Sequence, residues 1–140
     1  MEKISVSDLS IGDWVCAEVS CGVHIEPRLT PPMKVVGLGE SWVNLEIDPE
    51  QGDPFEYEPH EIRGVPITVE VLEKNGFYLI IDTCRIDTYS REGIYISMFS
   101  IPKITIIQQE SYLIKNSQVQ YVHQLQHALR LAGVGKEIVI

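Results

Sequence analysis

The chain has 140 residues, of which 44% are hydrophobic and 22% are charged, and its 20 acidic and 11 basic residues give a formal net charge of −9. This composition excludes a disordered chain, and no stretch approaches the roughly 18 uninterrupted apolar residues of a membrane span. The length suits one domain or two very small ones. The first residues lack a basic and apolar secretory signal, and the three cysteines lack disulfide-scaffold spacing. We therefore expect a cytoplasmic protein with reduced thiols.

The negative charge is concentrated in the first half. Residues 1–63 contain 13 acidic and 4 basic residues, whereas residues 64–140 contain seven of each. The densest window has no Lys or Arg, and its carboxylates are Glu46, Asp48, Glu50, Asp53, Glu56, Glu58 and Glu61. Such a field repels phosphate backbones and attracts cations, so it predicts a surface for a basic protein partner and disfavours nucleic acid. The plainer interpretation is that excess acid keeps a small protein soluble.

Residues 1–66 are predicted to form an acidic, SH3-like β-barrel module. Short strands are expected at residues 14–19, 33–38, 42–47 and 55–58. Alternation within 42–47 places Val43 and Leu45 on one face and Trp42 and Asn44 on the other, as in a strand with one buried side. The proline-rich stretch 21–32 is expected to be an exposed loop. A strongly bent barrel would remove exposed sheet edges.

Residues 67–140 are predicted to form a second, α+β module. It begins with a connecting helix of about two turns that is capped by Thr68 and ends at Asn75-Gly76. The expected strands are 77–82 and 93–99, paired directly across a polar connection, followed by 103–107, 112–114 and a last strand at 137–140. A helix over 117–132, capped by Ser117 and ended by Gly133, is expected to cover this antiparallel sheet. The whole chain is therefore predicted to be α+β.

The sharpest chemical pattern lies on this last predicted helix. At helical periodicity Val122, Leu125, Leu129 and Ala132 form an apolar stripe. His123 and His127 are four residues apart on a flanking face, so both imidazoles could reach one divalent cation, as in His-Glu-x-x-His metalloproteases. Gln124 stands where such a protease has its general-base Glu, and an amide cannot activate water. The alternatives are a metal site, used by a metal-dependent hydrolase, or a polar helix flank.

Other candidate chemistry is weaker. Cys16, Cys21 and His24 offer three soft ligands where structural zinc takes four, so Cys16 is predicted to be a core residue. Phosphate-binding loops, dinucleotide-binding glycine motifs and Gly-x-Ser-x-Gly elbows do not occur, which argues against common nucleotide enzymes and hydrolases. We therefore expect no catalytic residues and no cofactor. A third functional hypothesis is nucleic-acid binding by the second half, where Arg85, Arg91 and Lys103 would have to cluster.

Three stretches carry a resemblance to a known group. They are Leu-Ser-Ile-Gly-Asp-Trp-Val at 9–15, Gly-Val-Pro-Ile-Thr-Val-Glu-Val-Leu-Glu-Lys-Asn-Gly-Phe at 64–77, and Tyr-Val-His-Gln-Leu-Gln-His-Ala-Leu at 121–129. In this order they resemble uncharacterised small proteins of gut Bacteroidetes and their phages or mobile elements. The resemblance implies a source and a context but assigns no catalytic residues. The missing catalytic motifs and the charge asymmetry lead us to expect a non-enzymatic protein-interaction or accessory protein, and the resemblance adds a phage or mobile-element context.

Overall fold

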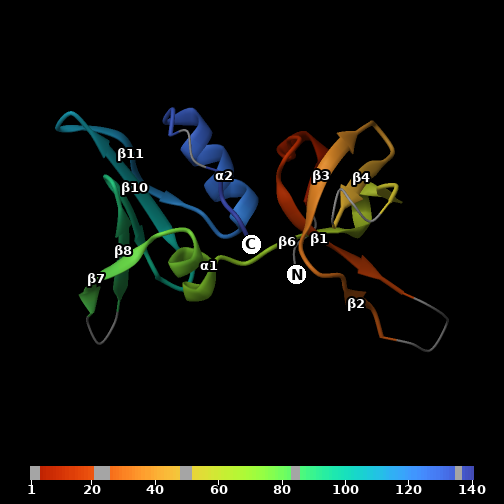
Figure 1. Cartoon of the computed structure of the whole chain (residues 1–140), viewed down its shortest axis with the longest axis horizontal. Coiled ribbons are helices and arrows are strands. Elements are labelled where there is room, and N and C mark those ends of the chain that lie inside the picture. Colours follow the sequence, from red (N-terminus) through yellow and green to blue (C-terminus); the bar gives the residue numbers. More distant parts are fainter. Residues whose placement is uncertain (1–3, 21–25, 48–51, 83–85, 135–136) are drawn as a thin grey trace. The chain divides into compact units, whose positions relative to one another are not determined.

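The computed structural model describes residues 4–20, 26–47, 52–82, 86–134 and 137–140 (Figure 1). The chain divides into two compact units, Met1–Val65 (unit 1) and Pro66–Ile140 (unit 2). Each unit contains one antiparallel sheet, and unit 2 also contains a long C-terminal helix. The predicted α+β class is therefore confirmed. Among the helices formed by these residues, none is both long and apolar enough to cross a membrane.

Unit 1 is built around the strand β1. Its elements are η1 (Val6–Asp8), β1 (Trp14–Val19), β2 (Arg28–Leu29), β3 (Met33–Leu38), β4 (Val43–Glu46), β5 (Phe55–Tyr57), η2 (Pro59–Glu61) and β6 (Ile62–Gly64). The sheet has the order β2-β1-β3-β4-β5, and β6 pairs antiparallel with β1. The last strand thus returns to the first, and the sheet bends into a half-barrel (Figure 1). The four predicted strands of this half are confirmed, whereas β2 and β6 were not predicted.

The core of unit 1 follows the strand periodicity. Val43 and Leu45 are fully buried, while Asn44 and Glu46 between and after them are only half-buried. They pack in one hydrophobic cluster with Ile4, Leu9, Val15, Ala17, Met33, Val35 and Ile62. Alternation fails at Ile47, which follows the end of β4 and is 50% exposed. One buried face and one exposed face are what the sequence pattern predicts for a sheet wrapped around its own core.

Unit 2 contains an antiparallel meander. Its elements are α1 (Val69–Lys74), β7 (Tyr78–Asp82), β8 (Asp87–Arg91), β9 (Ile94–Ser97), β10 (Lys103–Gln108), β11 (Ser111–Gln118) and α2 (Val122–Leu131). The strand order is β11-β10-β9-β8-β7, so each strand pairs only with its neighbours in the chain. The predicted direct pairing of 77–82 with 93–99 is wrong, because β8 lies between them and pairs with both. β8 is polar in sequence, which made it resemble a connection.

The connecting helix α1 matches its prediction closely. Thr68 Oγ1 accepts a hydrogen bond from the Val71 amide at 3.3 Å, as an N-cap does. The helix is capped at its C-terminal end by Asn75, and Gly76 adopts a φ of +84°, a backbone conformation that residues other than glycine rarely adopt. Leu72 is fully buried and is the main packing residue of the helix. Local capping signals are therefore sufficient to define this element.

The helix α2 begins later than predicted. It starts at Val122, and Ser117 is not its cap but part of β11, where it pairs with Ile104 of β10. Val122, Leu125 and Leu129 are buried as predicted, and Gly133 follows the helix with a φ of +72°. β9 and β10 bury four isoleucines, Ile94, Ile96, Ile104 and Ile106. Figure 1 shows α2 beside this sheet, as expected for a helix that covers its apolar face.

The C-terminal segment is not the predicted strand. Residues 137–140 have no regular structure, yet Ile138 is 2% exposed. The Asn75 side chain holds the segment: its Nδ2 donates to the Val139 carbonyl at 2.7 Å, and its Oδ1 accepts from the Val139 amide at 2.8 Å. The same Nδ2 also donates to the Val71 carbonyl at 2.7 Å. The side-chain amide of Asn75 therefore makes the hydrogen bonds that a neighbouring strand would otherwise make to Val139. It also connects the C-terminal segment to the end of α1.

We predict that Asn75→Ala lowers the free energy of unfolding of unit 2 by about 2–3 kcal/mol, because it removes three hydrogen bonds worth about 1 kcal/mol each. Urea unfolding followed by far-UV circular dichroism measures this loss, and amide hydrogen exchange at Val139 should accelerate. Glu73→Ala, at an exposed position of the same helix, is the control and should change stability little. A loss in Asn75→Ala no larger than in this control would contradict the assignment.

Candidate functional site

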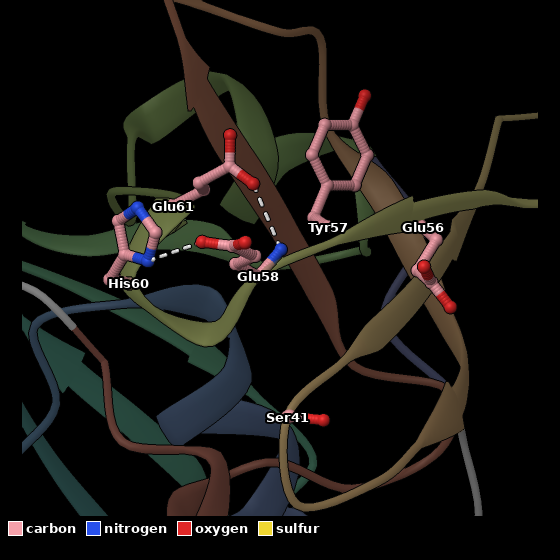
Figure 2. A pocket seen from close by; sticks show the side chains of 6 residues that line it. All are labelled: Ser41, Glu56, Tyr57, Glu58, His60 and Glu61. Carbon is pink, nitrogen blue, oxygen red and sulfur yellow. Dashed lines mark hydrogen bonds and ion pairs between the residues drawn. The ribbon is translucent and has the colours of Figure 1, made fainter.

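A surface hollow of about 470 Å³ lies in unit 1 (Figure 2). It is lined by Ser41, Glu56, Tyr57, Glu58, His60 and Glu61, and we call it the acidic hollow. All but one of these residues belong to the continuous segment from β5 to η2, and Ser41 comes from the connection between β3 and β4. The pairing of β4 with both β3 and β5 brings the two segments together. Three of the six lining residues carry carboxylates, so the hollow is suited to a cationic group.

The turn between β5 and η2 positions the acidic side chains. The Glu58 amide donates to Oε1 of Glu61 at 2.9 Å, and the Glu61 amide donates to the Glu58 carbonyl at 3.0 Å. Pro59 occupies the first position of η2, where its fixed φ and missing N–H are tolerated. This short 3₁₀ turn therefore holds Glu58 and Glu61 at the same end of the hollow.

His60 adds a titratable group at the rim. Its Nδ1 lies 3.2 Å from Oε2 of Glu58, and Figure 2 shows the two side chains pointing toward each other. The side chains are 62% and 70% exposed, so solvent screens the pair, which is ionic only when the imidazole is protonated. An ion pair of this kind contributes little to stability. It leaves the hollow open to an external cation.

Arg63, the arginine nearest to these residues in the sequence, does not line the hollow. Arg63 is 7% exposed, and its Nε lies 2.8 Å from Oε2 of Glu18. Its Nη1 donates to the carbonyls of His60 at 2.6 Å and Ile62 at 2.9 Å. Arg63 thus stabilises the backbone of this turn through hydrogen bonds to its carbonyl groups. Within the described ranges no Lys or Arg forms an ion pair with Glu56, Glu58 or Glu61, so His60 beside Glu58 is the basic side chain that these carboxylates have there.

Tyr57 supplies the aromatic side chain of the hollow. Burial, and secondarily the negative charge of Glu61, raise the pKa of its hydroxyl above the ordinary value. The phenol therefore stays protonated throughout the physiological range. It offers a neutral hydroxyl and an aromatic ring, and such a ring attracts cations through its π-face.

The acidic window predicted from the sequence only partly coincides with the hollow. Glu56, Glu58 and Glu61 line it. Glu46 is half-buried in β4 opposite Lys34, and Asp53 is exposed but is not a lining residue. Asp48 and Glu50 lie outside the described residues. Sequence reasoning missed Ser41 and Tyr57, and no local signal could have found Ser41, because strand pairing brings it to the site.

The histidine pair on α2 has a different environment. As predicted from the spacing, His123 and His127 are neighbours, with ring centroids 5.9 Å apart in an edge-to-face arrangement. His123 is only 3% exposed and stacks on Tyr121 at 5.8 Å, which corrects the expectation of a solvated flank. In the part of the chain that the structure describes, no group of three or more His, Cys, Asp or Glu residues could hold a metal ion. Catalytic zinc sites use three protein ligands, and the metal site stays a prediction.

Gln124 has a structural role at the start of α2. Its Oε1 accepts hydrogen bonds from the amides of Gln120 at 2.7 Å and Tyr121 at 3.0 Å. These amides belong to the residues that enter the helix. Gln124 occupies the position of a metalloprotease general base. Here it fixes the backbone conformation of the residues that lead into α2.

The remaining candidates that the structure describes, Cys16, Arg91 and Lys103, contact other parts of the protein. Cys16 is buried in β1, and burial raises the pKa of its thiol. Cys21, His24 and Arg85 lie outside the described residues. Arg91 is 7% exposed, and its Nη1 donates to the Asn75 carbonyl at 2.8 Å, so it is turned inward rather than toward a phosphate backbone. Lys103 lies over the ring of Phe99 at 5.1 Å.

Comparisons of the chain with protein-family models, with curated proteins and with solved structures find no match.

We predict that Gln124→Ala lowers the free energy of unfolding by about 1–2 kcal/mol, the usual cost of removing a helix cap. Gln124→Glu keeps the accepting oxygen and places a negative charge near the helix N-terminus, so it should be as stable as the wild type or slightly more stable. Thermal unfolding of both variants checks this pair of expectations. Equal destabilisation by Ala and Glu would show that the two hydrogen bonds are not what positions the helix.

Proposed function

We propose that this chain is a non-enzymatic protein-interaction or accessory protein whose acidic hollow binds a basic segment of a partner protein. The observation that carries the proposal is the convergence of Glu56, Glu58 and Glu61 on one hollow with no Lys or Arg paired to them among the described residues. A cationic side chain from outside would supply the missing countercharge. The net charge of −9, all of which arises in residues 1–63, would attract such a partner from a distance.

The hollow fits a lysine or arginine side chain by size and chemistry. Its volume of about 470 Å³ lies in the range of ordinary ligand sites. The carboxylates would accept the donors of the cation, and the Tyr57 ring offers an apolar and aromatic wall. Because Glu56 and Glu58 are exposed, salt would screen the attraction strongly. The interaction would therefore be fast, weak and sensitive to ionic strength.

The SH3-like classification of unit 1 belongs to the same proposal. It is supported by the pairing of β6 with β1 and by the 3₁₀ turn η2 immediately before β6, an arrangement that brings a small sheet toward closure. We also propose a cytoplasmic accessory role in the phage or mobile-element context that the sequence resemblance implies. The free, buried Cys16 is compatible with a reducing compartment.

We predict that the wild-type protein binds a fluorescent hexalysine peptide, and that binding weakens steeply between about 50 and about 300 mM NaCl. The triple variant Glu56→Gln, Glu58→Gln, Glu61→Gln should bind this peptide about tenfold more weakly. Glutamine at position 61 keeps the oxygen that accepts the Glu58 amide, so the turn should fold. Fluorescence anisotropy measures the affinities.

The matched control is Glu70→Gln, Glu73→Gln, Glu110→Gln, three exposed positions in unit 2. It has the same net charge as the hollow variant and should bind hexalysine almost as well as the wild type. If both variants lose affinity equally, the attraction comes from overall charge and the hollow is not the site. Absence of hexalysine binding at low salt would refute the proposal outright.

A further inference from the structure

We infer that β7 is an interface through which two copies of this chain pair strand to strand. β7 is the terminal strand of the unit 2 sheet, so β8 occupies one side of it and, among the described residues, no strand pairs with the other. An unpaired strand edge presents a row of N–H and C=O groups whose natural partner is another extended chain. The inference concerns unit 2 alone and does not depend on the acidic hollow.

Four of the five residues of β7 are aromatic or aliphatic and exposed. Tyr78, Leu79, Ile80 and Ile81 are 61%, 42%, 41% and 49% exposed. A register shift against β8 lies between Leu79 and Ile81, and such an irregularity interrupts the strict alternation that would turn every second side chain inward. Natural sheets usually protect a terminal strand with charge, and in β7 the charged residue is Asp82 at the end of the strand, after four uncharged residues.

The opposite edge of the same sheet has such protection. β11 carries Lys115 within the strand and Asn116 in a left-handed conformation with a φ of +49°. Two register shifts also interrupt its pairing with β10. A lysine and a distorted backbone are both devices that prevent edge-to-edge association. β7 also has one register shift, between Leu79 and Ile81, but its charged residue, Asp82, is the last of the strand, so β7 is the less protected of the two edges.

A second copy of this chain fits β7 better than a charged partner does. In an antiparallel pair about a twofold axis at the central residue, Ile80 lies opposite its own counterpart, and Leu79 lies opposite Ile81 of the other copy. The three central pairs are thus apolar on both sides, and Tyr78 lies opposite Asp82 of the other copy at each end of a self-complementary interface. Unit 2 has seven acidic and seven basic residues, so two such units do not repel each other through net charge. Unit 1, with its net charge of −9, would oppose association through its own surface.

The exposed side-chain area of β7 limits the size of the dimer interface. If a large side chain contributes on the order of 200 Å² when fully exposed, the four exposed fractions correspond to roughly 400 Å² per copy. Two copies would then bury roughly 800 Å², less than the 1,200–2,000 Å² of stable complexes. The dimer is therefore weak and depends on protein concentration.

Sedimentation equilibrium from about 10 µM to about 1 mM tests this interface by mass action. The wild type should change from monomer to dimer over this range. Ile80→Lys and Ile80→Glu should each stay monomeric, because each places like charges opposite one another at the twofold axis. An equimolar mixture of the two variants should recover a heterodimer, since Lys then faces Glu. Recovery cannot result from misfolding of either variant, and circular dichroism of each variant checks its fold.

The matched control is Leu113→Lys on β11, where Leu113 is 47% exposed. It should dimerise as the wild type does. A wild type that stays monomeric at 1 mM would overturn the inference. The free edge of β7 would then be available only to a strand of a different protein. A dimer that survives Ile80→Lys, or one that Leu113→Lys abolishes, would overturn it as well.

Discussion

The hydrogen-bonding demand of the strand backbone governs both units, because every buried N–H and C=O group needs a partner. In unit 1, β1 pairs with β2, β3 and β6, so the chain must return to its first strand at the end of the unit. The turn η2 makes that return, and the acidic hollow is formed on its outer side. In unit 2 each strand pairs only with its sequence neighbours, which leaves β7 as an open edge. Both proposed surfaces thus follow from how the strands are paired.

Two of the arginines are buried and stabilise the backbone. Arg63 and Arg91 are each 7% exposed and donate to backbone carbonyls that end a turn or a helix. A buried guanidinium needs such acceptors, and Arg63 also takes Glu18 as its ionic partner. Basic residues that stabilise the interior cannot neutralise carboxylates at the surface. In unit 1 the burial of Arg63 thus leaves Glu56, Glu58 and Glu61 without a paired Lys or Arg among the described residues.

Strong local signals predicted several elements well. The cap at Thr68 and the glycine at position 76 defined α1, and alternation defined β4. Elements that depend on distant partners were missed or misplaced. β8 is polar in sequence, yet Tyr89, Ser90 and Arg91 are buried in a strand that pairs with β7 and β9. β11 extends through Ser117 because β10 lies beside it. The predicted last strand is instead irregular chain, held by the side chain of Asn75.

Composition and periodicity alone were enough to establish an acidic first half, an α+β chain and the carboxylates near residue 60, because charge and amphipathic pattern are local properties. Which carboxylates share a hollow, which histidine is buried and which strand remains an edge were set by pairing between distant segments. Ser41 reaches the hollow through two strand ladders, and β7 is an edge because no described strand follows it in the sheet. Which distant segments come together depends on tertiary contacts, and these cannot be predicted from local sequence patterns.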